Sequence, residues 1–185
     1  METIETEVRF LEIDKNTLIK KLLSLRALDK GEVTLEEAII YGPENKWLNE
    51  RKFIRIRSDG DKTVVAYKEH TKQAIGGASE IEFEVSDFKK AESFFDKIGW
   101  APYRHQQKKR HTLQLGDVTF DIDTWPKVPT YVELEGPSES ALKQAAKAVG
   151  LDWKDVVVKD ARWVIENIYN IPVGNMRWFT FSKFE

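Results

Sequence analysis

Short runs in which charged residues alternate with apolar ones constrain the fold of this chain more than any other feature. In "KFIRIRSDGDKTVVAYKEH", two such runs flank Ser58-Asp59-Gly60-Asp61, a composition typical of a tight hairpin turn. Successive side chains of a strand point to opposite faces of the sheet, so each run predicts a strand with one ionic and one apolar face. The hairpin predicts antiparallel pairing.

The rest of the chain reads as further strands interleaved with amphipathic helices. Strands are expected at residues 4–10, 33–41, 78–85, 104–115, 118–125 and 131–136. Apolar residues at helical spacing predict helices at 14–28, 87–99, 138–150 and 159–170, with Asp14 or Asn16, Asp87 and Ser138 as N-caps. The aromatic segment "NMRWFTFSKFE" is expected to form a last strand or a lid. This order predicts an α+β fold with mainly antiparallel pairing.

Length and composition favour one globular domain. The 185 residues are 41% hydrophobic and 32% charged, and no repeat or long linker divides them, so we expect a single domain over 1–185 with an aromatic tail at 171–185. Basic residues number 29 and acidic residues 31, so no global field favours nucleic acid. Without Cys the chain has no disulfide and no thiolate metal site, and no apolar run is long enough to span a membrane. A cytoplasmic protein, monomeric or homodimeric, is expected.

The charged faces of the strands repeat one sign at two-residue spacing. The rows are Glu5, Glu7 and Arg9; Arg55 and Arg57; Lys68; Glu80, Glu82 and Glu84; Lys108 and Arg110; Asp121 and Asp123; Glu133 and Glu135. A sheet with its charged side in water is one interpretation. However, neighbouring like charges repel unless a counter-ion relieves them, and the helices need the apolar strand faces for burial. We therefore predict a closed barrel with a charged lumen and helices outside.

A lumen lined by carboxylates and cations suits a triphosphate. Carboxylates bind Mg²⁺ or Mn²⁺, and Arg and Lys bind phosphate oxygens. The chain contains no GxxxxGK[ST], HExxH or GxSxG motif, so P-loop, zincin and nucleophile-elbow chemistry lack support.

Seven short motifs occur in a familiar order over roughly the first 150 residues. They are "ETEVR" (5–9), "IRIR" (54–57), "AYK" (66–68), "EIEFEV" (80–85), "KKR" (108–110), "DID" (121–123) and "VELEG" (132–136). Together they resemble the CYTH superfamily, or triphosphate tunnel metalloenzymes, whose E-x-E-x-K signature is similar to "ETEVR". The resemblance implies an eight-stranded antiparallel tunnel that binds a triphosphate with Mg²⁺ or Mn²⁺. Members include class IV adenylyl cyclases, thiamine triphosphatases and inorganic triphosphatases.

The resemblance also implies roles for individual residues. The metal ligands would be Glu5, Glu7, Glu133 and Glu135, with Asp121 or Asp123 assisting. Phosphates would be bound by Arg55, Arg57, Lys68, Lys108 and Arg110, with Glu80 and Glu82 orienting these side chains or binding a second metal. The residues that act directly on the reaction would be Glu5, Glu7, Arg9, Lys68 and Arg110.

Three positions depart from the family pattern. Arg9 replaces the usual Lys and cannot supply a deprotonatable amine. Ala78 stands where many members have Arg, and the turn "TWPKVPTY" replaces a Gly-Leu-Gly turn. His70, His105 and His111 are too dispersed for a ligand cluster, and exposed or strand-end positions are expected for them.

The expected function is a divalent-metal-dependent phosphohydrolase that acts on inorganic tripolyphosphate, thiamine triphosphate or a nucleoside triphosphate. A class IV adenylyl cyclase, which converts ATP to cyclic AMP and pyrophosphate, is the alternative within the same fold. A non-catalytic module that binds polyphosphate or nucleotide is a third possibility.

Overall fold

A computed structural model describes residues 3–70, 75 and 77–185. The strands are β1 (Thr3–Glu5), β2 (Glu7–Phe10), β3 (Leu28–Ile40), β4 (Lys52–Ser58), β5 (Thr63–His70), β6 (Ala78–Val85), β7 (Arg104–Leu115), β8 (Val118–Thr124), β9 (Tyr131–Glu135) and β10 (Trp178–Phe179). The α-helices are α1 (Lys15–Ser24), α2 (Phe88–Lys97), α3 (Glu139–Val149) and α4 (Ala161–Asn167). Short 3₁₀ segments are η1 (Pro43–Asn49), η2 (Trp153–Asp155) and η3 (Val173–Asn175). No helix in these ranges is long and apolar enough to cross a membrane.

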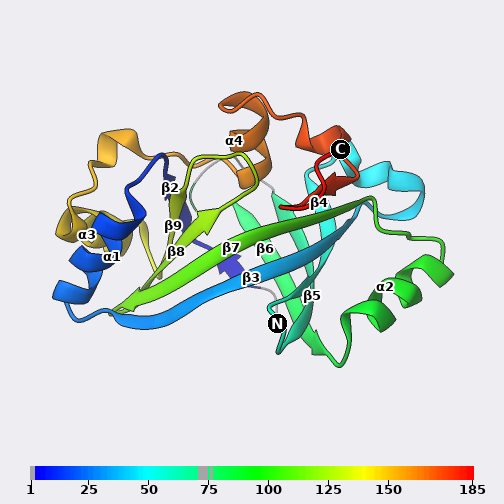
Figure 1. The fold of residues 1–185 in the computed structure, drawn as a ribbon, viewed down its shortest axis with the longest axis horizontal. Helices are drawn as coiled ribbons and strands as arrows, with labels where there is room; N and C mark the ends of the chain where they lie inside the picture. The colour runs from blue at the N-terminus through cyan, green and yellow to red at the C-terminus, as the bar shows by residue number, and fades with distance from the viewer. Residues whose placement is uncertain (1–2, 71–74, 76) are drawn as a thin grey trace.

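The strands form one strongly curled sheet (Figure 1). Its order is β1-β6-β5-β4-β3-β7-β8-β9-β2, with antiparallel pairing throughout, and β10 adds to β7 in parallel. The two ends of this order, β1 and β2, are separated in the chain by Thr6 alone. The N-terminal segment therefore borders β6 with its first half and β9 with its second half. Counted as one strand, it completes an eight-stranded antiparallel arrangement within the described residues, and the predicted α+β tunnel fold is confirmed.

The β3–β7 ladder is the longest in the sheet and begins earlier than the sequence predicts. Strand β3 starts at Leu28 rather than residue 33, and the preceding helix ends at Ser24 rather than residue 28. The register shifts between Asp29 and Glu32, where Gly31 has a positive φ of 83°. The bulge leaves this part of the strand without regular alternation, which is why the pattern did not reveal it.

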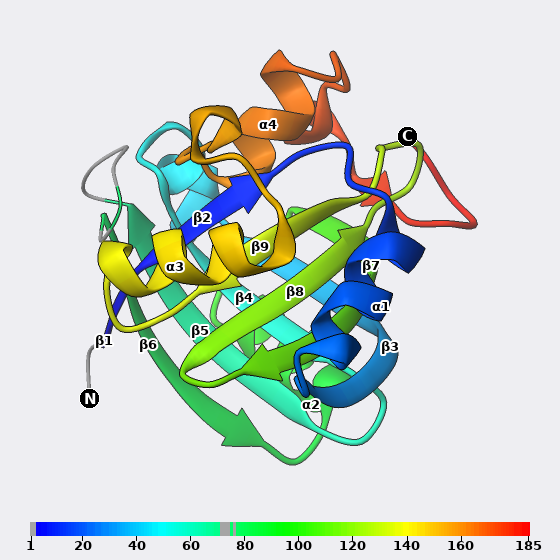
Figure 2. The ribbon, with the colours of Figure 1, turned by 90° about the vertical axis from the view of Figure 1, so that its left-hand side faces the viewer.

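The apolar faces of most strands point outward and are covered by helices. Helices α1 and α3 lie over the outer side of β2, β7, β8 and β9 (Figure 2), where Leu22 and Leu142 join a core that contains Val8, Phe120 and Leu134. On the other side, α2 packs against a cluster of Ala38, Ile40, Ile54, Ile56 and Val65. Asp14, Asp87 and Ser138 accept hydrogen bonds from backbone N–H groups at the starts of these helices, as predicted for N-caps.

A third apolar cluster ties α4 and the C-terminal segment to one end of the sheet (Figure 1). It contains Trp125, Tyr131, Ile165, Val173 and Phe179, all buried. Because α4 and η3 are anchored here, they lie across the end of the sheet at which β3 finishes and β7 begins.

Strand β6 is an exception to the expected helical cover. Ile81 and Phe83 on its apolar face remain 45% and 58% exposed. Helix α2 packs on β4 and the neighbouring strands, and its own Phe94 is also exposed. The expectation that helices cover every apolar face is therefore wrong for β6.

Candidate functional site

A cavity of about 570 Å³ runs along the concave side of the sheet. It is lined by eleven of the fourteen site residues expected from the sequence, contributed by β2, β4, β5, β6, β7 and β9: Glu7, Arg9, Arg55, Arg57, Lys68, Glu80, Glu82, Lys108, Arg110, Glu133 and Glu135. Asp121 and Asp123 lie in the wall behind them, where they contact Arg110 and Lys108. The side chain of Glu5 is outside the described part of the structure. The charged side of the sheet therefore faces this cavity.

Strand register brings these side chains together. In the β2–β9 pair Glu7 lies opposite Glu135, and Arg9 lies opposite Glu133. In the β5–β6 pair Lys68 lies opposite Glu80. Directly opposed residues share a face of the sheet, so each strand's alternation continues across its neighbour. Curling of the sheet then gathers the rows around one cavity.

Five cations, which we call the basic clasp, lie along this wall: Arg55, Arg57, Lys68, Lys108 and Arg110. On the β4–β5 side, Arg55 and Lys68 each lie 3.0 Å from an oxygen of Glu80. Arg57 donates a 2.7 Å hydrogen bond to Glu37, a residue that the sequence analysis did not assign to the site.

Glu37 is a buried carboxylate at the centre of this side. It accepts from Arg57 and from Gln106, at 2.7 and 2.5 Å, and its Oε1 lies 4.0 Å from Arg55. Burial raises the pKa of Glu37, but the guanidinium groups of Arg57 and Arg55 outweigh it and hold the pKa well below its usual range. Glu37 is therefore ionised and fixes the orientation of both arginines.

On the opposite side, two aspartates of β8 hold two cations of β7. Arg110 donates two 2.7 Å hydrogen bonds to Asp123 and one of 2.5 Å to Asp121. Lys108 donates to Asp123 at 2.7 Å. Burial and the neighbouring Arg110 charge lower the pKa of Lys108 to about 8, despite the attraction of Asp123. The charge of Lys108 therefore changes near pH 8.

Arg9 ties the N-terminal strand to the segment that precedes α4. Its Nη2 lies 3.0 Å from Glu7 and 2.7 Å from Glu133, and its Nη1 donates to the carbonyl of Lys159 at 2.8 Å. Burial lowers the pKa of Arg9, but Glu133 and Glu7 outweigh it and raise the pKa well above its usual value. A lysine has one terminal nitrogen, so it could not contact the two carboxylates with one nitrogen and the Lys159 carbonyl with another.

Glu7, Glu133 and Glu135, which we call the acidic cluster, provide the oxygen donors suited to a divalent cation. Partial burial and the charges of Glu133 and Glu7 raise the pKa of Glu135, which is the expected effect of crowded carboxylates. Within the described ranges, no three His, Cys, Asp or Glu side chains already converge as a metal site. Arg9 contacts both Glu133 and Glu7, and Arg110 contacts Glu133, whereas Glu135 has no ion pair among the described residues. The oxygen donors fit a divalent cation, and Glu135 is the member least engaged by neighbouring cations.

The cavity continues beyond the clasp toward η1, α4 and η3, a part that the sequence analysis missed. Its lining includes Arg51, Arg104, Asp160, Arg162 and Glu166. Asp160 caps α4 through a 2.8 Å hydrogen bond from the Trp163 backbone N–H. Polar residues at helix starts usually serve as caps, and Arg104 is the first residue of its strand, so neither position carried a distinctive signal.

The helix α4 is held in place over the cavity by polar contacts at both of its sides. Arg162 donates to the carbonyl of Leu48 in η1 at 3.2 Å. Glu166 accepts a 2.7 Å hydrogen bond from the backbone N–H of Gly174 in η3. These contacts fix α4 against η1 and η3 at this part of the cavity wall.

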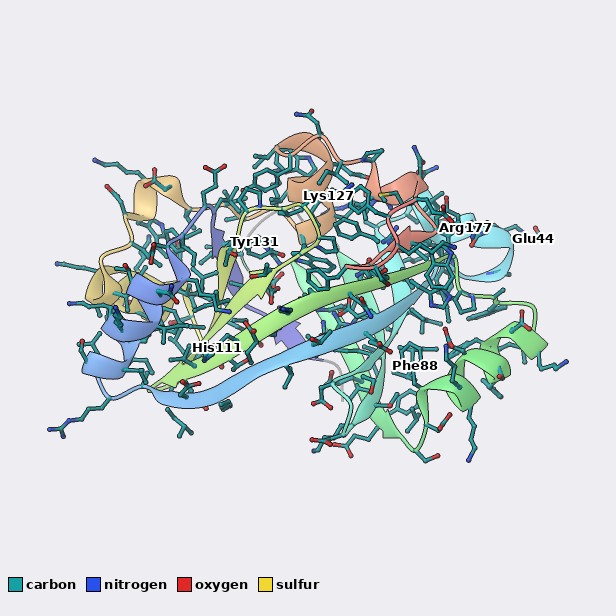
Figure 3. The ribbon with its side chains drawn as sticks, in the orientation of Figure 1. Glu44, Phe88, His111, Lys127, Tyr131 and Arg177 are labelled. Atoms are coloured by element: carbon teal, nitrogen blue, oxygen red, sulfur yellow. The ribbon has the colours of Figure 1, made fainter. Side chains whose placement is uncertain are left out.

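The described histidines lie outside the cavity. His105 stacks on Trp178 of the C-terminal segment, with 4.5 Å between ring centroids, and its Nδ1 is 3.3 Å from Glu92. His111 contacts Asp29 at 2.7 Å, toward the other end of the β3–β7 ladder (Figure 3). The His70 side chain is outside the described part of the structure. The aromatic C-terminal tail, expected as a last strand or a lid, forms the short strand β10, which pairs with β7.

Comparisons with known proteins agree with this architecture. A family model for the CYTH domain matches residues 3–158. The PH1012 protein from Pyrococcus horikoshii OT3 is 25% identical, with a TM-score of 0.72 over 85% of this chain and 96% of that one. A candidate adenylate cyclase from Vibrio parahaemolyticus is 12% identical, with a TM-score of 0.73 over 89% and 98% of the two chains.

A further structural relative is HpAC1 from Hippeastrum, a candidate adenylyl cyclase for which a dominant triphosphatase activity is described. It is 14% identical, with a TM-score of 0.62 over 94% of this chain and 99% of that one. A search of curated proteins found no match. The family match spans most of the described sheet and includes every strand that lines the cavity, and we conclude that this chain belongs to the CYTH domain family.

Proposed function

We propose that this protein is a divalent-metal-dependent phosphohydrolase that acts on a triphosphate bound in the charged cavity. The observation that carries the proposal is that the basic clasp and the acidic cluster line one cavity and meet at Arg110 and Glu133, whose side chains lie 3.6 Å apart. Cations in this arrangement neutralise phosphoryl oxygens through charge-assisted hydrogen bonds.

The clasp residues would bind and orient the phosphoryl groups. Arginine and lysine in fixed positions stabilise the charge that develops on phosphoryl oxygens during transfer. Glu37, Glu80 and Asp123 support this role because they hold the cations in place before any ligand binds. Such preorganisation avoids reorientation during the reaction.

Glu7 and Glu135, together with Glu5, would hold the divalent cation. When bound, Mg²⁺ or Mn²⁺ supplies Lewis acidity toward phosphate oxygens and toward a water molecule. The acidic cluster would also orient that water toward the terminal phosphoryl group. Arg9 stays protonated, so its role is to position Glu7 and Glu133 rather than to transfer a proton.

Turnover assays test the proposal. The protein is incubated with tripolyphosphate, thiamine triphosphate or ATP in the presence of Mg²⁺ or Mn²⁺, and orthophosphate, pyrophosphate and cyclic AMP are measured. Release of orthophosphate is the expected result. Cyclic AMP with pyrophosphate from ATP would instead identify a cyclase, and tight binding without any product would identify a binding module.

Arg57→Ala provides the matched variant for binding. It removes one clasp cation, and the dissociation constant for tripolyphosphate should rise at least about tenfold, as expected for loss of a charge-assisted hydrogen bond. Lys62→Ala, an exposed cation on the same hairpin, is the control and should bind as the wild type does. Equal affinity of Arg57→Ala and wild type would remove the clasp from the proposal.

A further inference from the structure

The end of helix α1 and the turn that follows it into β3 present three leucines to solvent. Leu23, Leu25 and Leu28 are 46%, 37% and 62% exposed. A single exposed leucine is common on a protein surface and needs no explanation. Here three of them fall within residues 23–28, a segment that we call the leucine tip. Apolar surface is therefore concentrated at one short turn outside the core.

The leucine tip is held in place by the end of α1. The backbone N–H of Ala27 donates to the Leu22 carbonyl at 3.0 Å, and the N–H of Arg26 donates to the Leu23 carbonyl at 2.9 Å. These two bonds form a Schellman motif, which closes the C-terminus of a helix. Leu22 and Ala27 are both buried in the core under α1. The turn is thus anchored by its buried residues, and the fold itself keeps the leucines at the surface.

Arg26 adopts a backbone conformation that a side chain disfavours. Its φ is 63°, in the left-handed region, at the position of the Schellman motif where glycine is usual. Local strain of this kind is concentrated at functional sites in proteins. The chain therefore carries a cation at the turn itself, where glycine would be the less strained residue.

Four cations without carboxylate partners accompany the leucines. Within the described part of the chain, no ion pair involves any of them, and the two carboxylates nearest in sequence, Asp29 and Glu32, contact His111 and Lys15 instead. The segment 15–33 contains five basic and two acidic residues, in a chain whose net charge is -2. This end of the molecule is therefore locally positive. The four cations are Lys20, Lys21, Arg26 and Lys30.

The leucine tip lies at one end of the long axis of the molecule, where α1 turns into β3 (Figure 1). Its residues are not part of the cavity lining. Peptide ligands that place apolar side chains on a protein usually do so in a groove. A turn at the end of the molecule can instead enter a surface layer ahead of the rest of the protein, which favours a lipid surface as the occupant.

We propose that the leucine tip docks on an anionic phospholipid membrane. The leucines enter the headgroup layer, and the four cations lie against the negative headgroups. Burial of apolar side chains and attraction to anionic lipids add together in proteins that bind membrane surfaces. The protein lies on the membrane without spanning it. Because the leucine tip is separate from the cavity, this inference does not depend on the proposed function.

Sedimentation with lipid vesicles tests the docking surface. Vesicles of phosphatidylcholine that contain phosphatidylserine are compared with vesicles of phosphatidylcholine alone at low ionic strength. The wild type should bind the anionic vesicles at least about tenfold more tightly, since each cation near an anionic surface contributes about fivefold. Added salt should weaken this binding, because it screens the attraction.

Two variants separate the apolar and the charged contributions. Leu28→Ser removes the most exposed leucine of the tip and should weaken binding to anionic vesicles at least about fivefold, because less apolar surface is buried. Lys20→Gln/Lys21→Gln removes two cations and should weaken it at least about tenfold. Both variants should keep the wild-type melting temperature, because all three side chains are exposed.

Each variant has a matched control elsewhere on the surface. Phe94→Ser removes an apolar side chain that is 61% exposed on α2, at the other end of the molecule (Figure 1). Lys46→Gln/Lys62→Gln changes the net charge by the same amount at two exposed cations. Both controls should bind anionic vesicles as the wild type does. Arg57→Ala should also do so, since Arg57 lines the cavity and not the tip.

Several outcomes would overturn the docking surface. These are equal binding of the wild type to both kinds of vesicle, no binding to either, and wild-type binding by Leu28→Ser or by the double lysine variant. Loss of binding in Arg57→Ala would show that headgroups enter the cavity instead. If the wild type ignores vesicles but binds a synthetic amphipathic peptide of Glu and Leu, and both tip variants lose that binding, the occupant is an acidic protein and the membrane proposal is wrong.

Discussion

Lys108 and Asp123 form an ion pair inside the tunnel wall, with 2.7 Å between Nζ and Oδ2 and an aspartate side chain that is fully inaccessible to solvent. The ion pair with Asp123 does not keep the pKa of Lys108 at its usual value. Burial of the ammonium and the nearby charge of Arg110 outweigh Asp123, and the pKa of Lys108 falls to about 8.

Tripolyphosphate affinity should therefore weaken as the pH rises through about 8. Below this pKa Lys108 is charged and contributes to the clasp, and above it the neutral amine does not. For the wild type, the dissociation constant measured above pH 8 should be higher than the constant measured below pH 8. Lys108→Arg keeps its charge over this range and should show a flatter profile. Parallel profiles for the two proteins would contradict the assignment.

Glu37→Gln should lower stability in the absence of ligand. It removes the carboxylate that pairs with Arg57 and Arg55, and breaking a buried ion pair costs about 3 kcal/mol or more. Tripolyphosphate should restore part of this loss, because it supplies negative charge to the same arginines. Thermal denaturation with and without the ligand measures both effects.

The control for Glu37 is its neighbour in the chain. Glu36→Gln alters an exposed carboxylate that accepts from Gln107 on the outer side of the same strand. Its melting temperature should match the wild type with and without tripolyphosphate. A Glu37→Gln protein as stable as this control would show that Glu37 does not organise the clasp.

Glu135→Gln should impair metal binding without loss of stability. The pKa of Glu135 is raised by burial and by the charges of Glu133 and Glu7, so ionised Glu135 is repelled in the folded protein and a neutral amide relieves that repulsion. The dissociation constant for Mn²⁺, followed by calorimetry, should rise at least about tenfold. Glu84→Gln is the control, because Glu84 is an exposed carboxylate that pairs with Lys62. Unchanged Mn²⁺ affinity would exclude Glu135 as a ligand.

Arg9→Lys should loosen the segment before α4. The lysine keeps the charge but cannot contact Glu7, Glu133 and the Lys159 carbonyl together, and loss of one such hydrogen bond costs about 1–2 kcal/mol. Hydrogen exchange at residues 157–160 should become faster, with β4 as an internal reference. Exchange equal to wild type would show that Arg9 does not anchor this segment.

Alternation alone was enough to predict that Arg55 and Arg57, and likewise Lys108 and Arg110, share one face of their strands, whereas their assignment to phosphate came from the family resemblance. Each strand then places its charges on one face of the sheet. Because the amphipathic helices have to pack on the apolar face, the charged face is the inner one. The expectation that a helix covers the apolar face failed for β6, since α2 packs on β4 and leaves Phe83 exposed. Helix placement depends on connections that a strand pattern does not contain.

Glu37 and Arg104 could not be assigned in this way. Glu36 and Glu37 are adjacent, so either could face the cavity, and the cavity-facing neighbours Leu35 and Ile39 are apolar rather than charged. Arg104 donates to the Tyr41 hydroxyl and to the Val173 carbonyl, which come from separate parts of the chain, and only the folded arrangement reveals that it lines the cavity.

The N-terminal segment that borders both β6 and β9 sets an order for folding during synthesis. Residues 7–10 leave the ribosome more than 120 residues ahead of their partners at 131–135. Contacts so distant in sequence form slowly, and an unpaired strand edge can pair with other chains in the meantime. The outer edges of the nascent sheet should therefore need protection, for example by a chaperone, until β9 is complete.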